Sequence, residues 1–283
     1  MEGQPSNKMP NRMSPVTFLV LVFLMSSIFW FLGAVAQGSL PKETAIDLPI
    51  SSLMAVCPMI AALILVHREN GSVGVKELFK RCFDYRRIKS KVWYIPILFL
   101  MPLIMVMVNI FKGNLPAAVP VSQPPVLMVL ISCVLFFIAA LTEEIGWQGY
   151  AFDPLQARWN ALIASLVLGF LWAIWHSIPF IQMHQSTSWI VWQSTNILLT
   201  RIIIVWLYNN TGKSLFAAIL YHSMYNVSTI LLPSFGLTYY PMVTTIILAG
   251  IVLVVIVLWG PKTLASYRHT RTSIWGKFSF HSN

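Results

Sequence analysis

Two adjacent glutamates, two histidines and an asparagine interrupt stretches of the sequence that otherwise carry no charge. Glu143 and Glu144 follow a long uncharged run, and His176 and His222 each lie inside an apolar block, the latter four residues before Asn226. A carboxylate or an imidazole can take a proton from water as that water attacks a carbonyl carbon. A second imidazole and an amide can donate hydrogen bonds to the oxyanion that develops. The set is therefore suited to hydrolysing an amide bond.

Each of these residues also has a simpler interpretation. A single histidine or asparagine in a membrane helix often only bridges to a neighbouring helix, and the glutamates could cap their helix in water. However, an ionisable side chain inside a bilayer costs about 2.5–3.5 kcal/mol even on the lenient insertion scale. Since residues four apart share one helical face, His222 and Asn226 point the same way. We therefore expect one shared site built from three helices.

The composition places these residues in a membrane protein. Of the 283 residues 57% are hydrophobic and 10% are charged, whereas soluble domains carry about 25% charged residues. A span needs about 20 mainly apolar residues, and eight uncharged blocks approach or reach that length. They are 16–36, 48–66, 92–111, 126–141, 161–181, 189–200, 214–232 and 240–260. The sequence predicts an all-α polytopic bundle of about eight transmembrane helices in the cell membrane.

The net charge of +10 reflects topology. Most of the 19 lysines and arginines lie before the first span, in the loop 68–91 or after the last span. Only Lys42 and Lys112 fall on the other side, and Arg201 lies within the sixth span. This asymmetry predicts that both termini are cytoplasmic. Because the basic residues also suit an anionic lipid surface, no nucleic acid partner is needed to explain them.

Three regions are expected along the chain. Residues 1–15 form a polar, disordered tail, residues 16–260 form the transmembrane domain, and residues 261–283 form a basic cytoplasmic tail. His222 would lie about 13 Å into its helix at 1.5 Å per residue, deeper than a glutamate at the cytoplasmic end of the fourth span. We therefore expect the fourth helix to be buried further and to continue through Tyr150.

Three short motifs now suggest a family. EEIGWQG, WAIWH and HSMYN resemble the motifs of the CAAX-type intramembrane endopeptidases, the CPBP or Abi family. Those motifs are a glutamate pair followed by an arginine, an aromatic residue four before a histidine, and a histidine four before an asparagine. The resemblance covers roughly residues 126–232. It implies a helical membrane fold and cleavage of a peptide bond near the bilayer. In the members that process prenylated proteins, it implies release of the last three residues of a CAAX tail.

The resemblance also implies roles for individual residues. It makes Glu143 and His176 the pair that activates water. It makes His222 and Asn226 the oxyanion stabilisers. Family members are often labelled metalloproteases, and Glu143, His176 and His222 could hold a zinc ion with one open position. No HExxH spacing is present, so the sequence leaves zinc open.

The supporting residues include one departure from the family motif. Trp172 takes the aromatic place before His176, and Glu144 supports the site. The motif arginine is replaced by Gln148, four residues after Glu144 and on the same helical face. The sequence thus predicts two crowded carboxylates without their cation, and this departure puts the activity of the peptidase in question.

Three function classes follow from these observations. The leading hypothesis is an intramembrane endopeptidase whose substrate is a peptide or protein, with or without a prenyl group. The alternative is a non-catalytic immunity or scaffold protein of the same fold, which binds and does not cleave. The third is an ion- or proton-coupled transporter with the glutamates as carriers. The sequence shows no internal repeat, and repeats are common in transporters.

Overall fold

The computed structural model describes residues 14–39, 50–113 and 124–265, and within these ranges it contains helices and no strand. Eight helical segments are long and apolar enough to cross a membrane. The main helices are α1 (Pro15–Ser39), α2 (Cys57–Cys82), α3 (Tyr94–Phe111), α4 (Val126–Gly146), α6 (Ala161–Gln182), α7 (Thr187–Asn210), α8 (Leu215–Asn226) and α9 (Pro241–Trp259). The prediction of a multi-pass helical membrane protein is confirmed.

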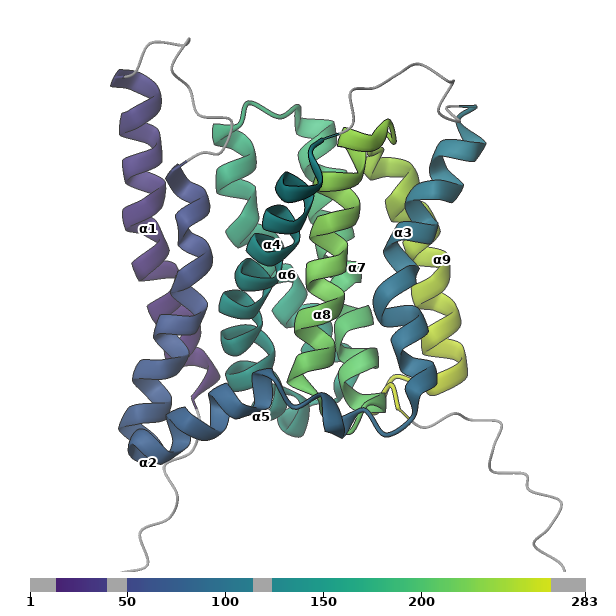
Figure 1. Cartoon of the computed structure of the whole chain (residues 1–283). Helices are drawn as coiled ribbons and strands as arrows, with labels where there is room; N and C mark the ends of the chain where they lie inside the picture. The colour runs from purple at the N-terminus through teal and green to yellow at the C-terminus, as the bar shows by residue number, and fades with distance from the viewer. Residues whose placement is uncertain (1–13, 40–49, 114–123, 266–283) are drawn as a thin grey trace, which may run out of the picture.

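The helices form one bundle with the predicted site residues on its central members. In Figure 1, α1 and α2 lie along one edge, α3 and α9 along the other, and α4, α6, α7 and α8 between them. The even number of spans brings the start of α1 and the end of α9 to the same end of the bundle (Figure 1). Which side of the membrane that end faces stays a prediction. The predicted tails, 1–15 and 261–283, fall almost entirely outside the described residues.

Two glycines allow the central helices to approach closely. A Cβ at Gly169 of α6 would lie 3.1 Å from Arg201 Cβ on α7. A Cβ at Gly146 of α4 would lie only 2.5 Å from the carbonyl oxygen of Pro58 on α2. Small residues at such crossings let two helix backbones pack tightly in a membrane. These contacts therefore fix α4 and α7, which carry charged residues, against their neighbours.

The fourth span continues well beyond its uncharged run. After α4 the chain passes through a π-helix, η5 (Trp147–Phe152), into the short α5 (Asp153–Arg158), so that the whole span is Val126–Arg158. All six residues of η5 are buried, and Phe18 of α1 packs on Trp147 and Tyr150, with ring centroids 5.5 Å apart in both pairs. The expected continuation through Tyr150 is confirmed. The glutamates consequently lie within the span, away from its end.

The second helix bends at a glycine before it reaches the end of the bundle. Gly71 has φ +61°, in the left-handed region that other residues rarely adopt. Beyond it the rest of α2 runs along the base of the bundle (Figure 1). Leu78 on this part is buried, whereas Phe79 and Phe83 are exposed. This distribution fits a segment that lies at the membrane surface.

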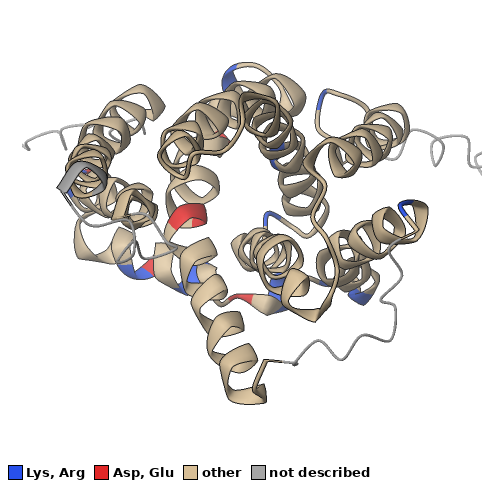
Figure 2. Ribbon diagram, turned by 90° about the horizontal axis from the view of Figure 1, so that it is seen from above, with Lys and Arg blue, Asp and Glu red and all other residues tan. Residues whose placement is uncertain are grey.

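Few charged residues occur inside the bundle. Figure 2, seen from above, shows that nearly all of the described ribbon is uncharged, with scattered basic and acidic positions. Of the charged residues that the structure describes, three have almost entirely buried side chains, namely Glu143, Glu144 and Arg201. Because burying a charge without a partner is costly, the arrangement of these three residues determines the chemistry of the core.

Candidate active site

Glu144 is the most enclosed residue of the site and has two partners. Its side chain is fully buried. Arg201 Nη1 donates to Oε2 at 2.7 Å, and Arg201 Nη2 donates to Oε1 at 3.1 Å. His222 Nδ1 lies 3.0 Å from the same Oε1. A two-pronged guanidinium–carboxylate pair combines strength with a fixed geometry, so Glu144 is held by α7 and α8 together.

Arg201 corrects one expectation of the sequence analysis. The glutamate pair was expected to lack a cation because Gln148 replaces the motif arginine, but α7 supplies a guanidinium to Glu144. Gln148 itself is fully buried, and neither of its side-chain polar atoms has a hydrogen-bond partner among the described residues. An arginine in an apolar span was the signal that could have identified this residue. The sequence places Arg201 within the sixth span, and a buried charge there needs a partner.

Glu143 faces a different histidine. Trp172 Nε1 donates a hydrogen bond of 2.8 Å to Glu143 Oε2, and His176 Nε2 lies 4.0 Å from the same oxygen. That distance is too long for a direct hydrogen bond, but one water can bridge two groups at such a separation. Glu143 and His176 therefore face each other at a separation that one bridging water can span.

A hydrogen bond to the backbone indicates which ring nitrogen of His176 carries the proton. Nδ1 lies 3.1 Å from the backbone carbonyl oxygen of Trp172. Because a carbonyl oxygen only accepts, Nδ1 carries the proton, and in the neutral ring Nε2 then has a free lone pair. Nε2 is the nitrogen that lies towards Glu143. The imidazole thus presents a base towards the carboxylate.

The partner of His222 sets its protonation in the same way. Glu144 is ion-paired with Arg201 and therefore accepts, so His222 Nδ1 must donate to it. Nε2 can donate a hydrogen bond only when the ring is protonated on both nitrogens. A doubly protonated His222 would therefore present an N–H group on the side of the ring opposite Glu144.

Trp172 lies between the two acid–histidine pairs. Its ring packs edge-to-face against His176 and His222, with centroids 5.4 and 5.2 Å apart. The guanidinium of Arg201 lies 4.2 Å from the centre of the same ring, within range for a cation–π contact. The structure thus brings together Glu143, Glu144, Trp172, His176 and His222, with Arg201 as an addition.

The remaining predicted residue is less firmly placed. Asn226 ends α8 one turn beyond His222, and its side chain is partly exposed. Within the described part of the chain it makes no hydrogen bond to the glutamates or histidines. Its role as an oxyanion stabiliser stays a prediction.

The three residues left open as zinc ligands do not form a metal cluster. Across the described ranges, no group of three or more histidine, cysteine, aspartate or glutamate side chains is arranged to hold a metal ion. The acids and histidines instead pair two by two, His222 Nδ1 with Glu144 at 3.0 Å and His176 Nε2 with Glu143 at 4.0 Å. Glu143, His176 and His222 therefore do not fit a shared zinc ion in this arrangement, and we assign no step to a metal.

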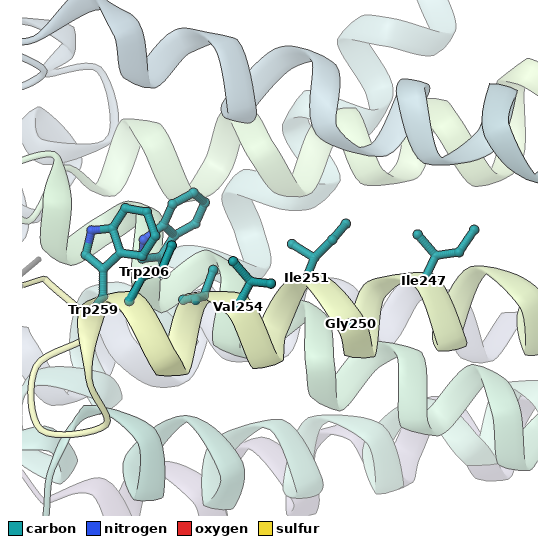
Figure 3. A pocket seen from close by; sticks show the side chains of 8 residues that line it. Trp206, Ile247, Gly250, Ile251, Val254 and Trp259 are labelled. Carbon is teal, nitrogen blue, oxygen red and sulfur yellow. The ribbon is translucent and has the colours of Figure 1, made fainter. Parts of the chain in front are cut away.

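A separate apolar groove lies away from these residues. It has a volume of about 400 Å³ and is lined by Trp206 of α7 and by residues of α9. Figure 3 shows the α9 side chains Ile247, Ile251 and Val254 along it, with Trp206 and Trp259 at one end. None of the acid–histidine residues lines it. The groove consequently plays no part in the chemistry considered below.

Comparison with known proteins matches the region of the chain that contains the three motifs. Residues 123–228 match a family model described as type II CAAX prenyl endopeptidase Rce1-like. Over 244 residues the chain is 29% identical to CAAX prenyl protease 2 of Methanococcus maripaludis, covering 78% of this chain and 86% of that protein. Over 126 residues it is 26% identical to membrane protein insertase YidC 2 of Staphylococcus epidermidis, covering 38% of this chain and 43% of that protein.

The fold and the buried residues define a multi-pass integral membrane protein with an acid–histidine cluster at its centre. Within that class, the chain is similar to the CAAX prenyl endopeptidases over its central region, and this similarity agrees with the resemblance drawn from its three motifs. The matched range 123–228 includes every residue of the cluster. This similarity supports a peptidase.

Proposed function

We propose that this protein is an intramembrane endopeptidase that hydrolyses a peptide bond near the cytoplasmic face of the membrane. The observation that carries the proposal is the separation of 4.0 Å between His176 Nε2 and Glu143 Oε2. One water can bridge two basic groups at that separation, and this pair lies next to the second pair, formed by His222 and Glu144. Relatives named as CAAX prenyl proteases support the same reaction class.

The proposed reaction begins with that water. His176 Nε2 orients it through a lone pair, and Glu143 takes one of its protons as the oxygen attacks the carbonyl carbon. Trp172 holds Glu143 Oε2 through its indole N–H, which fixes the direction of the carboxylate. The C–N bond then breaks, and the proton held by Glu143 passes to the departing amine. The products are a new carboxyl end and a new amino end.

The negative charge on the carbonyl oxygen needs donors. We assign that task to His222 Nε2–H in the imidazolium form and to the side-chain amide of Asn226, one turn along the same face of α8. Each donor of this kind is worth about 100- to 1,000-fold in kcat in a site that excludes water. Glu144, held by Arg201, keeps a proton on His222 Nδ1 and orients the ring.

The substrate proposed is a peptide or protein segment at the bilayer surface. The name of the Methanococcus maripaludis relative points to CAAX tails, so a prenylated peptide and its unmodified counterpart are the first two probes. Purified full-length protein is incubated with each, and the products are analysed by mass spectrometry, with and without a chelator. The control is a Glu143→Gln/His222→Ala double variant at equal concentration.

We expect paired fragments whose masses add up to the peptide plus one water, from wild type only. Cleavage by wild type and double variant alike would assign the activity to a contaminant and contradict the proposal. Binding of either peptide without new ends would favour the non-catalytic scaffold. Flux of a solute into liposomes without new ends would favour a transporter.

Trp172 offers a milder test of the same site. Trp172→Phe keeps an aromatic ring between the histidines but removes the N–H that reaches Glu143. We expect kcat to fall about tenfold or more, because a hydrogen bond to a charged group contributes about 1.5–3 kcal/mol. The matched control is Trp159→Phe, at a half-exposed tryptophan outside the cluster. If both variants keep the wild-type kcat, the indole N–H does not orient Glu143.

A further inference from the structure

The arginine that pairs with Glu144 lies on a different helix from the motif position at which the family has an arginine. The family motif places an arginine where this sequence has Gln148, and the buried amide of Gln148 has no hydrogen-bond partner in the described structure. Arg201 is fully buried 53 positions further along, on α7, and binds both carboxylate oxygens of Glu144. The site thus keeps a cation beside its glutamates but takes it from another helix.

We propose that Arg201 is the positioning residue of the active site and replaces the motif arginine missing at position 148. The proposal deepens the peptidase function proposed above and rests on it. Arg201 acts through other side chains, since its contacts in the cluster are with Glu144 and Trp172. It therefore sets geometry and charge and does not take part in bond breaking.

One set of contacts leads from Arg201 to the oxyanion side of the site. The guanidinium fork fixes the plane of the Glu144 carboxylate, and Oε1 of that carboxylate accepts from His222 Nδ1. A planar fork restrains orientation in a way that a point charge does not. Without Arg201, the buried carboxylate of Glu144 would lose its guanidinium partner, and the orientation of the carboxylate that binds His222 Nδ1 would no longer be fixed.

A second set of contacts leads from Arg201 to the water-activating side. The guanidinium packs against the ring of Trp172, 4.2 Å from its centre, and the indole N–H of Trp172 holds Glu143. Arg201 therefore links both acid–histidine pairs from one point. Gly169 on α6 leaves room for Arg201 on α7, since a Cβ at Gly169 would lie 3.1 Å from Arg201 Cβ.

The geometry also indicates where a substitute arginine can be introduced, namely at the motif position 148. Gln148 follows Glu144 by four residues along the same continuous span, and its side chain is already buried. Glu144 lies in the last turn of α4 and Gln148 in the first turn of η5. An arginine introduced at position 148 therefore tests whether a cation supplied from η5 can pair with Glu144 once Arg201 is gone.

The test compares full-length variants in detergent and in liposomes. The set is Arg201→Gln, Arg201→Lys, Gln148→Arg/Arg201→Gln and Glu144→Gln/Arg201→Gln. Arg87→Gln is the matched control, because Arg87 pairs with Asp84 at 2.9 Å on the exposed surface. Each protein is assayed for kcat and KM on the peptide that wild type cleaves, starting from the prenylated and unmodified CAAX probes, and for its thermal unfolding midpoint.

We expect Arg201→Gln to lower kcat about 100-fold with little change in KM, the scale expected when reacting groups are misplaced by about 1 Å. Arg201→Lys should retain more activity, because it keeps the charge without the fork. Gln148→Arg/Arg201→Gln should recover at least about tenfold in kcat over Arg201→Gln, as coupled partners do in double-variant cycles. Arg87→Gln should match wild type.

The unfolding midpoints supply a readout that does not depend on catalysis. Arg201→Gln should lower the midpoint, and both double variants should raise it again, one by restoring a cation and the other by removing the lone carboxylate. Wild-type kcat in Arg201→Gln would overturn the proposal. So would a Gln148→Arg/Arg201→Gln protein with neither kcat nor midpoint recovered.

Failure of the peptidase function would be recognised separately. If wild type cleaves neither probe, the proposed activity is contradicted, while the midpoints still test the relocated cation. Recovery of the unfolding midpoint in both double variants would then support Arg201 as the source of the cation that pairs with Glu144. Equal midpoints for Arg201→Gln and both double variants would overturn it.

Discussion

Glu143→Gln is expected to lower kcat by about 100- to 10,000-fold, the contribution of a positioned general base. The substitution keeps the size of the side chain and an oxygen that can accept from Trp172 Nε1, so the 2.8 Å contact can persist. It removes the negative charge and the basicity that take the proton from water. KM should stay close to that of wild type, because the amide still fills the site.

The matched control is Glu77→Gln, the same change at an exposed glutamate beside Lys80 on the surface part of α2. That variant should match wild type in kcat and in KM. The measurement is the initial rate of product formation on the cleaved probe, with protein amounts normalised by folded membrane fraction. Activity of Glu143→Gln within threefold of wild type would mean that another group removes the proton.

Gly146→Ala is expected to have the largest effect on the fold. The added methyl would lie 2.5 Å from the carbonyl oxygen and 2.6 Å from the Cβ of Pro58, so α2 and α4 must separate. Overpacking of this kind typically destabilises by about 1–3 kcal/mol. Because Glu143 and Glu144 lie within the same turn of α4, activity should fall together with the unfolding midpoint.

Gly250→Ala in α9 provides the comparison, because no atom lies within 4 Å of a Cβ placed there. It adds the same methyl to a spanning helix at an open position. We expect its unfolding midpoint to match or exceed that of wild type. If the two glycine variants unfold at the same temperature, the close crossing of α2 and α4 does not limit stability.

Much of the fold could be predicted from the sequence because a bilayer constrains it strongly. Apolar length alone identified eight spans, and the cost of burying ionisable groups identified Glu143, His176 and His222. The depth argument also placed the glutamates correctly, since it required the fourth helix to continue through Tyr150. The π-helix that carries this continuation gives no comparable signal, because no feature of its sequence, WQGYAF, separates it from an α-helix.

The partner of Glu144 could not be predicted in the same way. Local spacing favoured Gln148, four residues away, whereas the actual contact joins residues 144 and 201 on helices that meet only in the folded bundle. Periodicity describes which residues share a face of one helix but not which faces of two helices meet. A simple balance of buried charges would have found Arg201, since two buried carboxylates require a cation.

The Glu144–Arg201 pair has a consequence for how the protein is made. The two residues belong to separate spans, α4 and α7, so each segment enters the membrane with an unneutralised charge at a cost of about 2.5–3.5 kcal/mol. Because α4 precedes α7 in the chain, Glu144 is synthesised before the arginine that neutralises it. Neutralisation then stabilises the contact between these helices, and this couples assembly of the bundle to formation of the acid–histidine cluster.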